Sequence, residues 1–148
     1  MRPLVVACVL AFSLACRTES PRAGAAPMDA AAVESTLVRF SVALARADTA
    51  TLRTLAAPTF VLLDEGKAYD LDATVASILS VLATAQMTRV PKDVRVERRG
   101  DVAWASYRVQ GDFRTGSATV PLRMLEAAVL ERTRDGWRVA QMATLAER

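Results

Sequence analysis

The chain has 148 residues, of which 52% are hydrophobic and 24% charged, and its formal net charge is +3 at pH 7. That length suits a single domain, and the high apolar fraction excludes a disordered chain. The sequence contains no histidine, which excludes Ser-His-Asp and Cys-His nucleophile machinery, histidine-ligated zinc or haem, and histidine proton shuttles.

The first residues read as a targeting signal. Arg2 precedes an apolar stretch over residues 4–15, which has the length of a secretory signal and is too short to cross a bilayer. The stretch ends in Ser13-Leu14-Ala15-Cys16, which resembles the lipobox of bacterial lipoproteins except for its first residue, where an aliphatic side chain is usual. We expect a lipid-modified Cys16. The alternative is an ordinary secreted protein cut near Ala15 or Ala25.

Cysteine usage agrees with an extracytoplasmic protein. Cys8 and Cys16 are the two cysteines of the chain and both lie in the leader, so the mature domain has no internal disulfide and no thiol nucleophile. Residues 16–27 are rich in Pro, Ala and polar side chains, which is typical of a flexible tether. We therefore expect a signal peptide over 1–15, a tether over 16–27 and a globular domain over 28–148. The predicted location is extracytoplasmic, lipid-anchored to the membrane, with a soluble secreted or periplasmic protein as the alternative.

Two helices are expected at the start of the domain. Apolar residues recur at helical spacing in the first, which we expect from Asp29, acting as N-cap, to about residue 47. Asp48 or Thr49 begins a second, short helix, which Pro58 stops. The apolar positions of these two helices are Val33, Leu37, Phe40, Leu44, Leu52 and Leu55.

A strand and a third helix follow. Residues 59–64 are β-branched, aromatic and aliphatic, and Glu65-Gly66 supplies a turn to a very short strand over 67–69. Asp70 then caps a third helix that runs to about residue 85. One apolar stripe is expected along it, formed by Leu71, Val75, Ile78, Leu79 and Leu82.

After Pro91 the hydrophobic period changes from that of a helix to that of a strand. Residues 122–133 are ambiguous by propensity alone, but Asp135-Gly136 is a strong two-residue hairpin signal that needs a strand on both sides. We expect a type I′ turn with these two residues at its centre. The expected strands are 93–99, 102–110, 122–133 and 137–144.

Three short segments occur in a characteristic order along the domain. They are Ala45-Arg46-Ala47-Asp48 followed by Leu52 and Leu55, then residues 60–66, then Gly136-Trp137-Arg138-Val139. Together with the element order they resemble the nuclear transport factor 2-like superfamily, especially its SnoaL-like bacterial branch, over about residues 28–144. The resemblance implies an α+β, cone-like fold, in which N-terminal helices pack in a strongly curved, mostly antiparallel sheet around a pocket. It also implies a homodimer formed through the outer sheet face.

The resemblance gives little support for catalysis. In enzymatic relatives a His or Asp inside the cone acts as acid or base, and a His often follows the Trp-Arg-Ile/Val segment by a few residues. This chain has Gln141 in that region, and an amide can orient a ligand but cannot act as a general base. Strand alternation puts Gln141 on one face with Trp137 and Val139, so it is a polar group in an apolar pocket if that face lines the cone. A hydrogen bond to a neighbouring loop or water is the alternative.

Asp64 is the remaining acid/base candidate. Phe60 and Leu62 of the same strand should point to the core, and a carboxylate buried beside them would have its pKa raised by desolvation. Asp64 can equally end a strand at a surface turn. Asp64 clusters with Glu65, Asp70 and Asp72, but Asp70 caps a helix and Asp64-Glu65-Gly66 forms a turn, so we expect no metal site. No phosphate-binding or dinucleotide motif indicates a cofactor.

Aromatic residues supply further candidate ligand contacts. Trp104 and Tyr107 lie on opposite faces of one predicted strand, so at most one lines the pocket, and each can instead be a core residue. The candidate ligand contacts are Tyr69, Trp104, Tyr107 and Gln141.

We expect a non-catalytic, membrane-tethered domain that binds a small apolar ligand or acts as an accessory module. The alternatives are a small-molecule isomerase or hydratase that uses Asp64 as acid or base, and a purely structural dimer. The 19 Lys and Arg residues are spread among acidic residues instead of forming a patch, so we expect no nucleic-acid partner.

Overall fold

The computed structural model describes residues 27–147, which fold into three helices and one seven-stranded sheet. The expected signal peptide and Cys16 lie outside the described residues, as does the expected tether apart from its last residue. Within the described part of the chain, no helix has both the length and the apolar character needed to cross a membrane. The helices are α1 (Pro27–Arg46), α2 (Thr49–Leu55) and α3 (Leu71–Leu82). The strands are β1 (Ala56–Asp64), β2 (Lys67–Tyr69), β3 (Gln86–Met87), β4 (Val90–Arg99), β5 (Val102–Thr115), β6 (Ala118–Thr133) and β7 (Gly136–Ala146).

The sheet is built mainly from long consecutive hairpins. Its strand order is β2-β1-β7-β6-β5-β3, and β4 pairs with the other end of the same edge of β5. All neighbouring strands are antiparallel except β1 and β7, which run parallel. The expected α+β fold with a curved, mostly antiparallel sheet is therefore confirmed.

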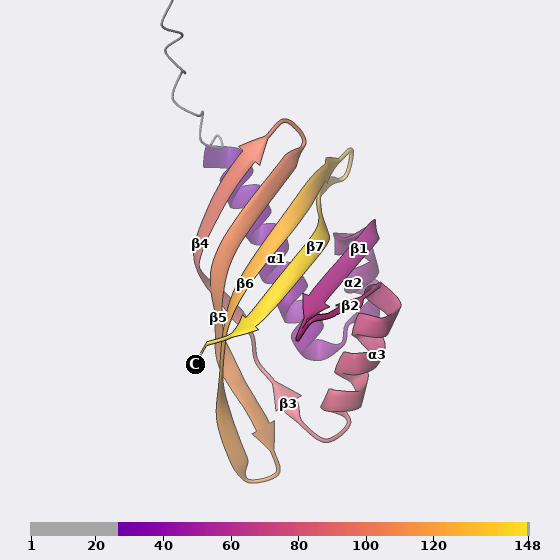
Figure 1. Ribbon diagram of the computed structural model, residues 1–148, viewed down its shortest axis with the longest axis vertical. Coiled ribbons are helices and arrows are strands. Elements are labelled where there is room, and N and C mark those ends of the chain that lie inside the picture. Colours follow the sequence, from indigo (N-terminus) through magenta and orange to yellow (C-terminus); the bar gives the residue numbers. More distant parts are fainter. Residues whose placement is uncertain (1–26, 148) are drawn as a thin grey trace, which may run out of the picture.

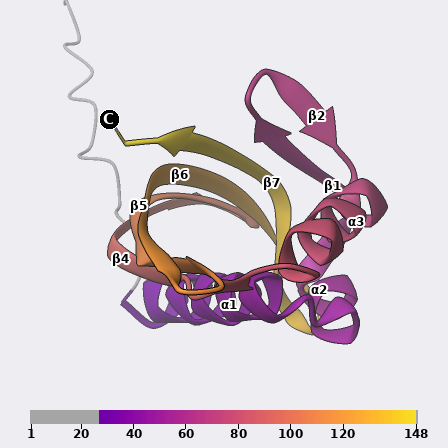
Figure 2. The ribbon, with the colours of Figure 1, turned by 90° about the horizontal axis from the view of Figure 1, so that it is seen from below.

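The core lies between the concave face of this sheet and α1. Figure 2 shows the sheet curving over α1, with α2 and α3 grouped at the β1 side, and Figure 1 shows α1 passing behind β4 to β7. The predicted apolar face of α1 is buried, and Phe40 packs on Phe60 of β1 with ring centroids 5.5 Å apart. The larger side chains of this core are Val33, Leu37, Phe40, Leu44, Leu52, Leu55, Phe60, Tyr107, Val109, Leu130, Trp137, Val139 and Met142.

The ends of the helical elements differ from the expectations. Asp29 is not an N-cap, because α1 begins at Pro27, and its carboxylate instead pairs with Arg98 of β4 at 2.6 Å and Arg132 of β6 at 3.1 Å. Asp48 caps α2 and Asp70 caps α3, each accepting a backbone N–H, as predicted. On α3 the expected stripe is wrong at Leu79, which is 51% exposed, and the buried residues of that helix are Thr74 and Val75.

Strand β1 begins three residues before the expected start. Ala56 already has extended dihedrals and pairs with Val139 of β7, so tertiary pairing ends α2 at Leu55 before Pro58 is reached. Pro58 lies inside β1, in a stretch where the register between β1 and β7 is interrupted. Proline has no N–H to donate to a strand ladder, and it is tolerated there because this stretch of β1 has no partner on β7.

The two predicted hairpin turns are present, but type I′ geometry is wrong for the second. The β6–β7 loop consists of Arg134 and Asp135, neither of which has a positive φ, and Thr133 pairs with Gly136. Gly136, the first residue of β7, instead has a positive φ, of +117°. In the β1–β2 hairpin both loop residues, Glu65 and Gly66, have positive φ, as a type I′ turn requires.

Candidate functional site

A row of polar side chains crosses the inner face of the sheet. Register places Tyr107 of β5 directly opposite Glu126 of β6, and Glu126 directly opposite Thr144 of β7. All three side chains are buried. Thr144 in turn donates a hydrogen bond of 2.5 Å from Oγ1 to Oδ1 of Asp64, at the end of β1. Four strands therefore contribute one polar residue each to a continuous line across the concave face.

Glu126 and Arg89 form the charged centre of this row. The Glu126 side chain is fully buried, and its Oε1 accepts a charge-assisted hydrogen bond from Nη2 of Arg89 at 2.5 Å. The Arg89 side chain is 9% exposed, so both charges are withdrawn from water. A buried carboxylate of this kind is tolerated because the guanidinium compensates its charge, and removing either partner leaves an uncompensated charge.

A short backbone segment, Thr88-Arg89, holds the arginine over the sheet, and we call it the strap. It connects β3 to β4 along one edge of β5 and packs closely against Gly111. Two hydrogen bonds join the strap to Asp112. Thr88 N–H donates to the Asp112 carbonyl at 2.9 Å, and Asp112 N–H donates to Thr88 Oγ1 at 2.9 Å. A Cβ on Gly111 would lie 2.0 Å from the Thr88 carbonyl oxygen, so only glycine allows this close approach.

Tyr107 is a hydrogen-bond donor in this environment, because its phenol stays protonated. Burial, and then the negative charge of Glu126, raise the pKa of Tyr107 far above its usual value of 10.0, with the positive charge of Arg89 opposing in part. The site thus combines a carboxylate, a guanidinium and a neutral phenol at the centre of an apolar face.

Three buried polar atoms in this half of the fold have no hydrogen-bond partner among the described residues. They are Oε2 of Glu126, Nε of Arg89 and Oγ of Ser41. Ser41 lies on α1, the helix that covers the same concave face. Buried polar atoms are normally bonded, so each of these three atoms can take a further hydrogen bond.

The structure brings together only some of the side chains expected to form the site. Tyr107 is in the buried row, whereas Trp104, on the opposite face of β5, is 36% exposed on the outer surface. Tyr69 lies half-buried on β2 opposite Leu62. Asp64 is half-buried beside the Glu65-Gly66 turn and is bonded to Thr144. Among the described residues, no three Asp or Glu side chains converge closely enough to hold a metal ion.

Gln141 does not line the interior. We expected it to contact a ligand only if its face of the strand lined the cone, and that condition is not met. In the β6–β7 ladder Leu130 pairs with Val139 and Val129 pairs with Gln141, so Ala140 is an extra residue on β7. This bulge reverses the alternation: Val139 is buried before it, Met142 is buried after it, and Gln141 is exposed.

Sequence reasoning missed Glu126 and Arg89. The signal for Glu126 was available, because from residue 118 to residue 130 every even-numbered position of its strand except 126 is apolar. This alternation is visible only if the whole segment is treated as a strand. The helical propensity of the segment obscured the alternation. Arg89 lies outside any periodic segment, so only the tertiary packing of the strap reveals it. The inward positions of this strand are Leu122, Met124, Glu126, Ala128 and Leu130.

Comparison with known proteins gives a consistent family and fold. The sequence model of the SnoaL-like domain family matches residues 33–144, and no curated protein matches the chain. The fold is similar to that of a ketosteroid isomerase-like protein from Erwinia carotovora atroseptica, with 22% identity, a TM-score of 0.68, and coverage of 83% of this chain and 99% of that one. A candidate dehydratase of the NTF2-like family from Streptomyces avermitilis has 20% identity, a TM-score of 0.71, and coverage of 82% and 97%. A candidate aromatic ring hydroxylase from Novosphingobium aromaticivorans has 15% identity, a TM-score of 0.73, and coverage of 82% and 90%.

Proposed function

Because this chain belongs to the SnoaL-like domain family of the nuclear transport factor 2-like superfamily, we propose that it is a binding domain whose cone holds one small molecule without transforming it. The observation that carries this proposal is that the buried Arg89–Glu126 pair leaves Arg89 Nε and Glu126 Oε2 without a hydrogen-bond partner among the described residues. A ligand with one hydrogen-bond donor and one acceptor would satisfy Glu126 Oε2 and Arg89 Nε together.

The charge of the cluster restricts the ligand to a neutral polar group. Arg89 and Glu126 compensate each other, so a carboxylate or an ammonium group would bring an additional unpaired charge into a dry interior. The side chains around the row are apolar, including Val109 and Met142. The proposed ligand is therefore a small, mainly apolar molecule that carries an alcohol, amide or similar neutral group.

The alternative function is proton transfer on such a ligand. Glu126 and Tyr107 are direct cross-strand neighbours, and the protonated phenol could polarise a carbonyl while the carboxylate removes an adjacent proton. Isomerase-like and dehydratase neighbours of the same fold make this a chemically reasonable alternative. In this version Glu126 replaces Asp64 as the base, because Asp64 lies at a surface turn and accepts a hydrogen bond from Thr144.

Mass spectrometry of compounds that co-purify with the full-length protein tests the binding function. We expect a bound neutral compound in the wild type and in Glu131→Gln, an exposed position on the same strand, but not in Glu126→Gln. Ser41→Ala, which removes an unpaired hydroxyl without breaking an ion pair, should also weaken retention if Glu126→Gln fails to fold. No bound compound in any variant would refute the proposal. Exchange of ligand hydrogens with deuterated water, catalysed by the wild type and lost in Glu126→Gln, would establish the enzymatic alternative instead.

We further propose that the domain is anchored outside the cytoplasm by a lipid on Cys16. The support is the apolar leader and the Ser13-Leu14-Ala15-Cys16 segment. In a bacterial host the full-length protein should partition into detergent, and Cys16→Ser should release it or stall its processing. Recovery of both forms in the soluble fraction with the same mature mass would contradict the anchor.

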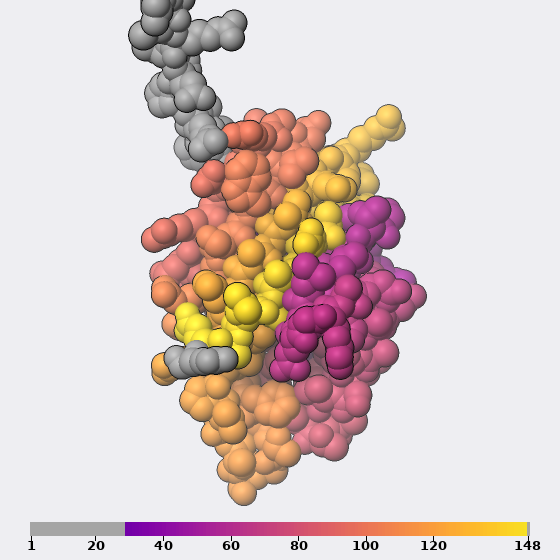
Figure 3. All heavy atoms as spheres, viewed as in Figure 1, coloured from indigo at the N-terminus to yellow at the C-terminus, as the bar shows by residue number. Residues whose placement is uncertain are grey.

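The partner we propose for the outer sheet face is a second copy of the chain. Figure 3 shows this face, where β5, β6 and β7 lie side by side. Three large apolar side chains, Trp104, Leu125 and Leu145, are exposed on these strands at 36%, 44% and 67%. Sedimentation should give a dimer for the wild type and a monomer for Leu125→Glu with an unchanged circular dichroism spectrum. A monomeric wild type would refute the dimer.

A further inference from the structure

One edge of β4 has no strand beside it in the part of the chain that the structure describes. β4 pairs with β5 alone, and Figure 1 shows it as the outermost strand on its side of the sheet. A strand edge of this kind presents a row of backbone N–H and C=O groups that can pair with another extended chain.

Hairpin geometry identifies which backbone groups point out from this edge. Arg99 and Val102 flank the two-residue β4–β5 turn and are paired, so these two residues exchange their backbone hydrogen bonds. Bonded positions alternate along an antiparallel ladder, so every second residue back from Arg99 also turns its backbone groups to β5. The backbone groups of Val96 and Arg98 therefore point away from the sheet.

The two halves of the edge differ in how well they are protected from pairing. The first half contains Pro91 and a bulge at Asp93, which has φ +54° and lies where the register with β5 shifts. Residues 94–99 follow the bulge and contain neither proline nor glycine, and their ladder with β5 is regular from Arg95 onward. We call residues 94–99 the free edge.

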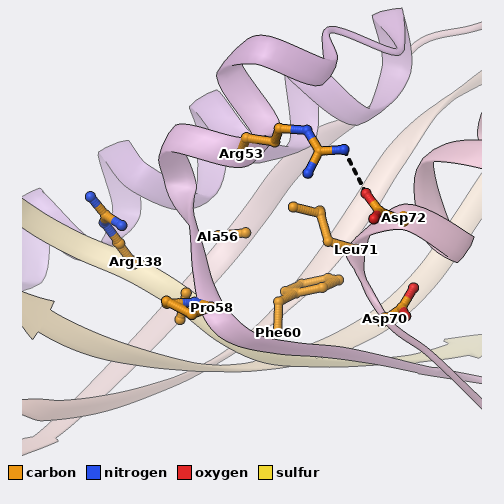
Figure 4. Close-up of a pocket in the computed structure, with 9 residues that line it drawn as sticks. Arg53, Ala56, Pro58, Phe60, Asp70, Leu71, Asp72 and Arg138 are labelled. Atoms are coloured by element: carbon orange, nitrogen blue, oxygen red, sulfur yellow. Dashed lines mark hydrogen bonds and ion pairs between the residues drawn. The ribbon is translucent and has the colours of Figure 1, made fainter.

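The charges of the free edge alternate in sign and have no partner within the described chain. Arg95 and Glu97 are exposed on the outer face of β4, and neither takes part in any ion pair that the described residues form. On the other side of the molecule, by comparison, Arg53 and Asp72 line a hollow between α2 and α3 and pair at 2.6 Å (Figure 4). Arg95 and Glu97 are thus available to the charges of a second chain.

We propose that the free edges of two copies of this chain pair antiparallel about a two-fold axis at Val96. In this register Arg95 of each copy lies directly opposite Glu97 of the other, and Val96 lies opposite Val96. The outward backbone groups of the two Val96 residues then face each other and exchange hydrogen bonds. Directly opposite residues of unlike charge stabilise a strand pair.

Charge excludes the neighbouring registers. A shift by one residue would turn the outward groups of one edge toward groups already bonded to β5. A shift by two residues keeps the backbone pairing but places Arg95 opposite Arg95, or Glu97 opposite Glu97, and like charges directly opposite are destabilising. The free edge is therefore complementary to itself, which is why the proposed occupant is a second copy. This contact uses the edge of β4 and not the outer-face side chains assigned above to a dimer, so the two contacts are independent.

Cysteine cross-linking tests the register, and it can trap a contact as small and weak as one short strand pair. Opposite residues whose backbone groups are not bonded to each other have α-carbons about 4.5 Å apart, within the range of about 4.4 to 6.8 Å that a disulfide spans. Full-length Arg95→Cys and Glu97→Cys chains are co-expressed in a bacterium and oxidised with copper phenanthroline. Each chain also carries Leu125→Glu, so the outer-face contact plays no part.

We expect a covalent dimer on a non-reducing gel when the two variants are present together. Neither variant by itself should give one, because neither residue faces its own counterpart. The Leu125→Glu chain without an introduced cysteine is the blank for Cys8 and Cys16. No cross-link in the mixture, or equal cross-linking of either variant alone, would overturn the proposal.

Charge reversal tests the complementarity. The mixed dimer keeps one ion pair, between Glu97 of the Arg95→Cys chain and Arg95 of the Glu97→Cys chain. Adding Glu97→Arg to the first chain should lower the yield about fivefold, because two arginines then face each other. Adding Arg95→Glu to the second chain as well should restore the yield, since the pair is then reversed.

The matched control is Glu34→Arg, which makes the same change of charge at an exposed position on α1 and should leave the yield unchanged. Arg95 and Glu97 are exposed and make no ion pair within the described chain, so these variants should fold, as circular dichroism can verify. An undiminished yield with two facing arginines, no restoration by the second reversal, or an equal loss in the control would each show that the free edges do not pair in this register.

Discussion

The close packing of the strap against Gly111 predicts that a single added methyl group disturbs the buried ion pair. In Gly111→Ala the new Cβ would lie 2.0 Å from the Thr88 carbonyl oxygen, whereas ordinary contact begins at 3.4 Å. β5 cannot move aside, because Gly111 is paired with Leu122 on its other edge. The strap must therefore move away from Gly111 by more than an ångström.

The expected loss of stability comes from the hydrogen bonds of the strap and from the ion pair of Arg89. Lifting Thr88 loses two backbone-anchoring hydrogen bonds to Asp112, each worth about 0.5 to 1.5 kcal/mol. Any withdrawal of Arg89 from Glu126 adds to this, because breaking a buried pair costs about 3 to 5 kcal/mol in full. We expect the free energy of unfolding to fall by about 2 to 4 kcal/mol, with partial loss of the ion pair.

Urea denaturation followed by circular dichroism measures this change. Gly116→Ala is the matched control, because its Cβ meets nothing within 4 Å and only the positive φ of +58° is strained. It should cost about 1 kcal/mol. In Glu126→Gln, where the ion pair is already removed, Gly111→Ala should cost less than it does in the wild type. A Gly111→Ala variant no less stable than Gly116→Ala, or one whose cost is unchanged by Glu126→Gln, would refute the role of the strap.

Three further predictions concern the turn, the strand end and the buried phenol. Gly136→Val should lower the free energy of unfolding by about 1 to 3 kcal/mol, because Gly136 has φ +117°, and an unchanged melting temperature would mean that this turn is misplaced. Asp64→Asn should lower the free energy of unfolding by about 0.5 to 1 kcal/mol, because the hydrogen bond from Thr144 becomes weaker, and should leave ligand binding unchanged. A stabilised variant that loses an activity would instead identify Asp64 as a base. Because the pKa of Tyr107 is raised in the folded state, the unfolded chain releases this proton first as the pH rises past 10.0, so wild-type stability should decline there by about 1.4 kcal/mol per pH unit for this group. Urea melts between pH 9 and pH 11 should show a shallower decline in Tyr107→Phe, and equal slopes would contradict the raised pKa.

The sequence by itself determined the features that depend on local pattern. The apolar spacing of α1, the Asp48 and Asp70 caps, and the Glu65-Gly66 turn follow from interactions within a few residues of the chain. The period-two alternation of the C-terminal half likewise fixed a sheet of hairpins, and the order of these elements was enough to indicate the family. These features were predictable because helix and turn energetics are set mostly by near neighbours.

Only the tertiary structure decided which polar residues face the interior. One extra residue in β7, Ala140, turned Gln141 outward, and no local signal in the sequence marks that bulge. Arg89 and Glu126 are 37 positions apart and meet because the strap packs closely against β5 at a glycine. Each of these features depends on how distant strands align, and strand register is set by packing over the whole sheet, not by the residues of one segment.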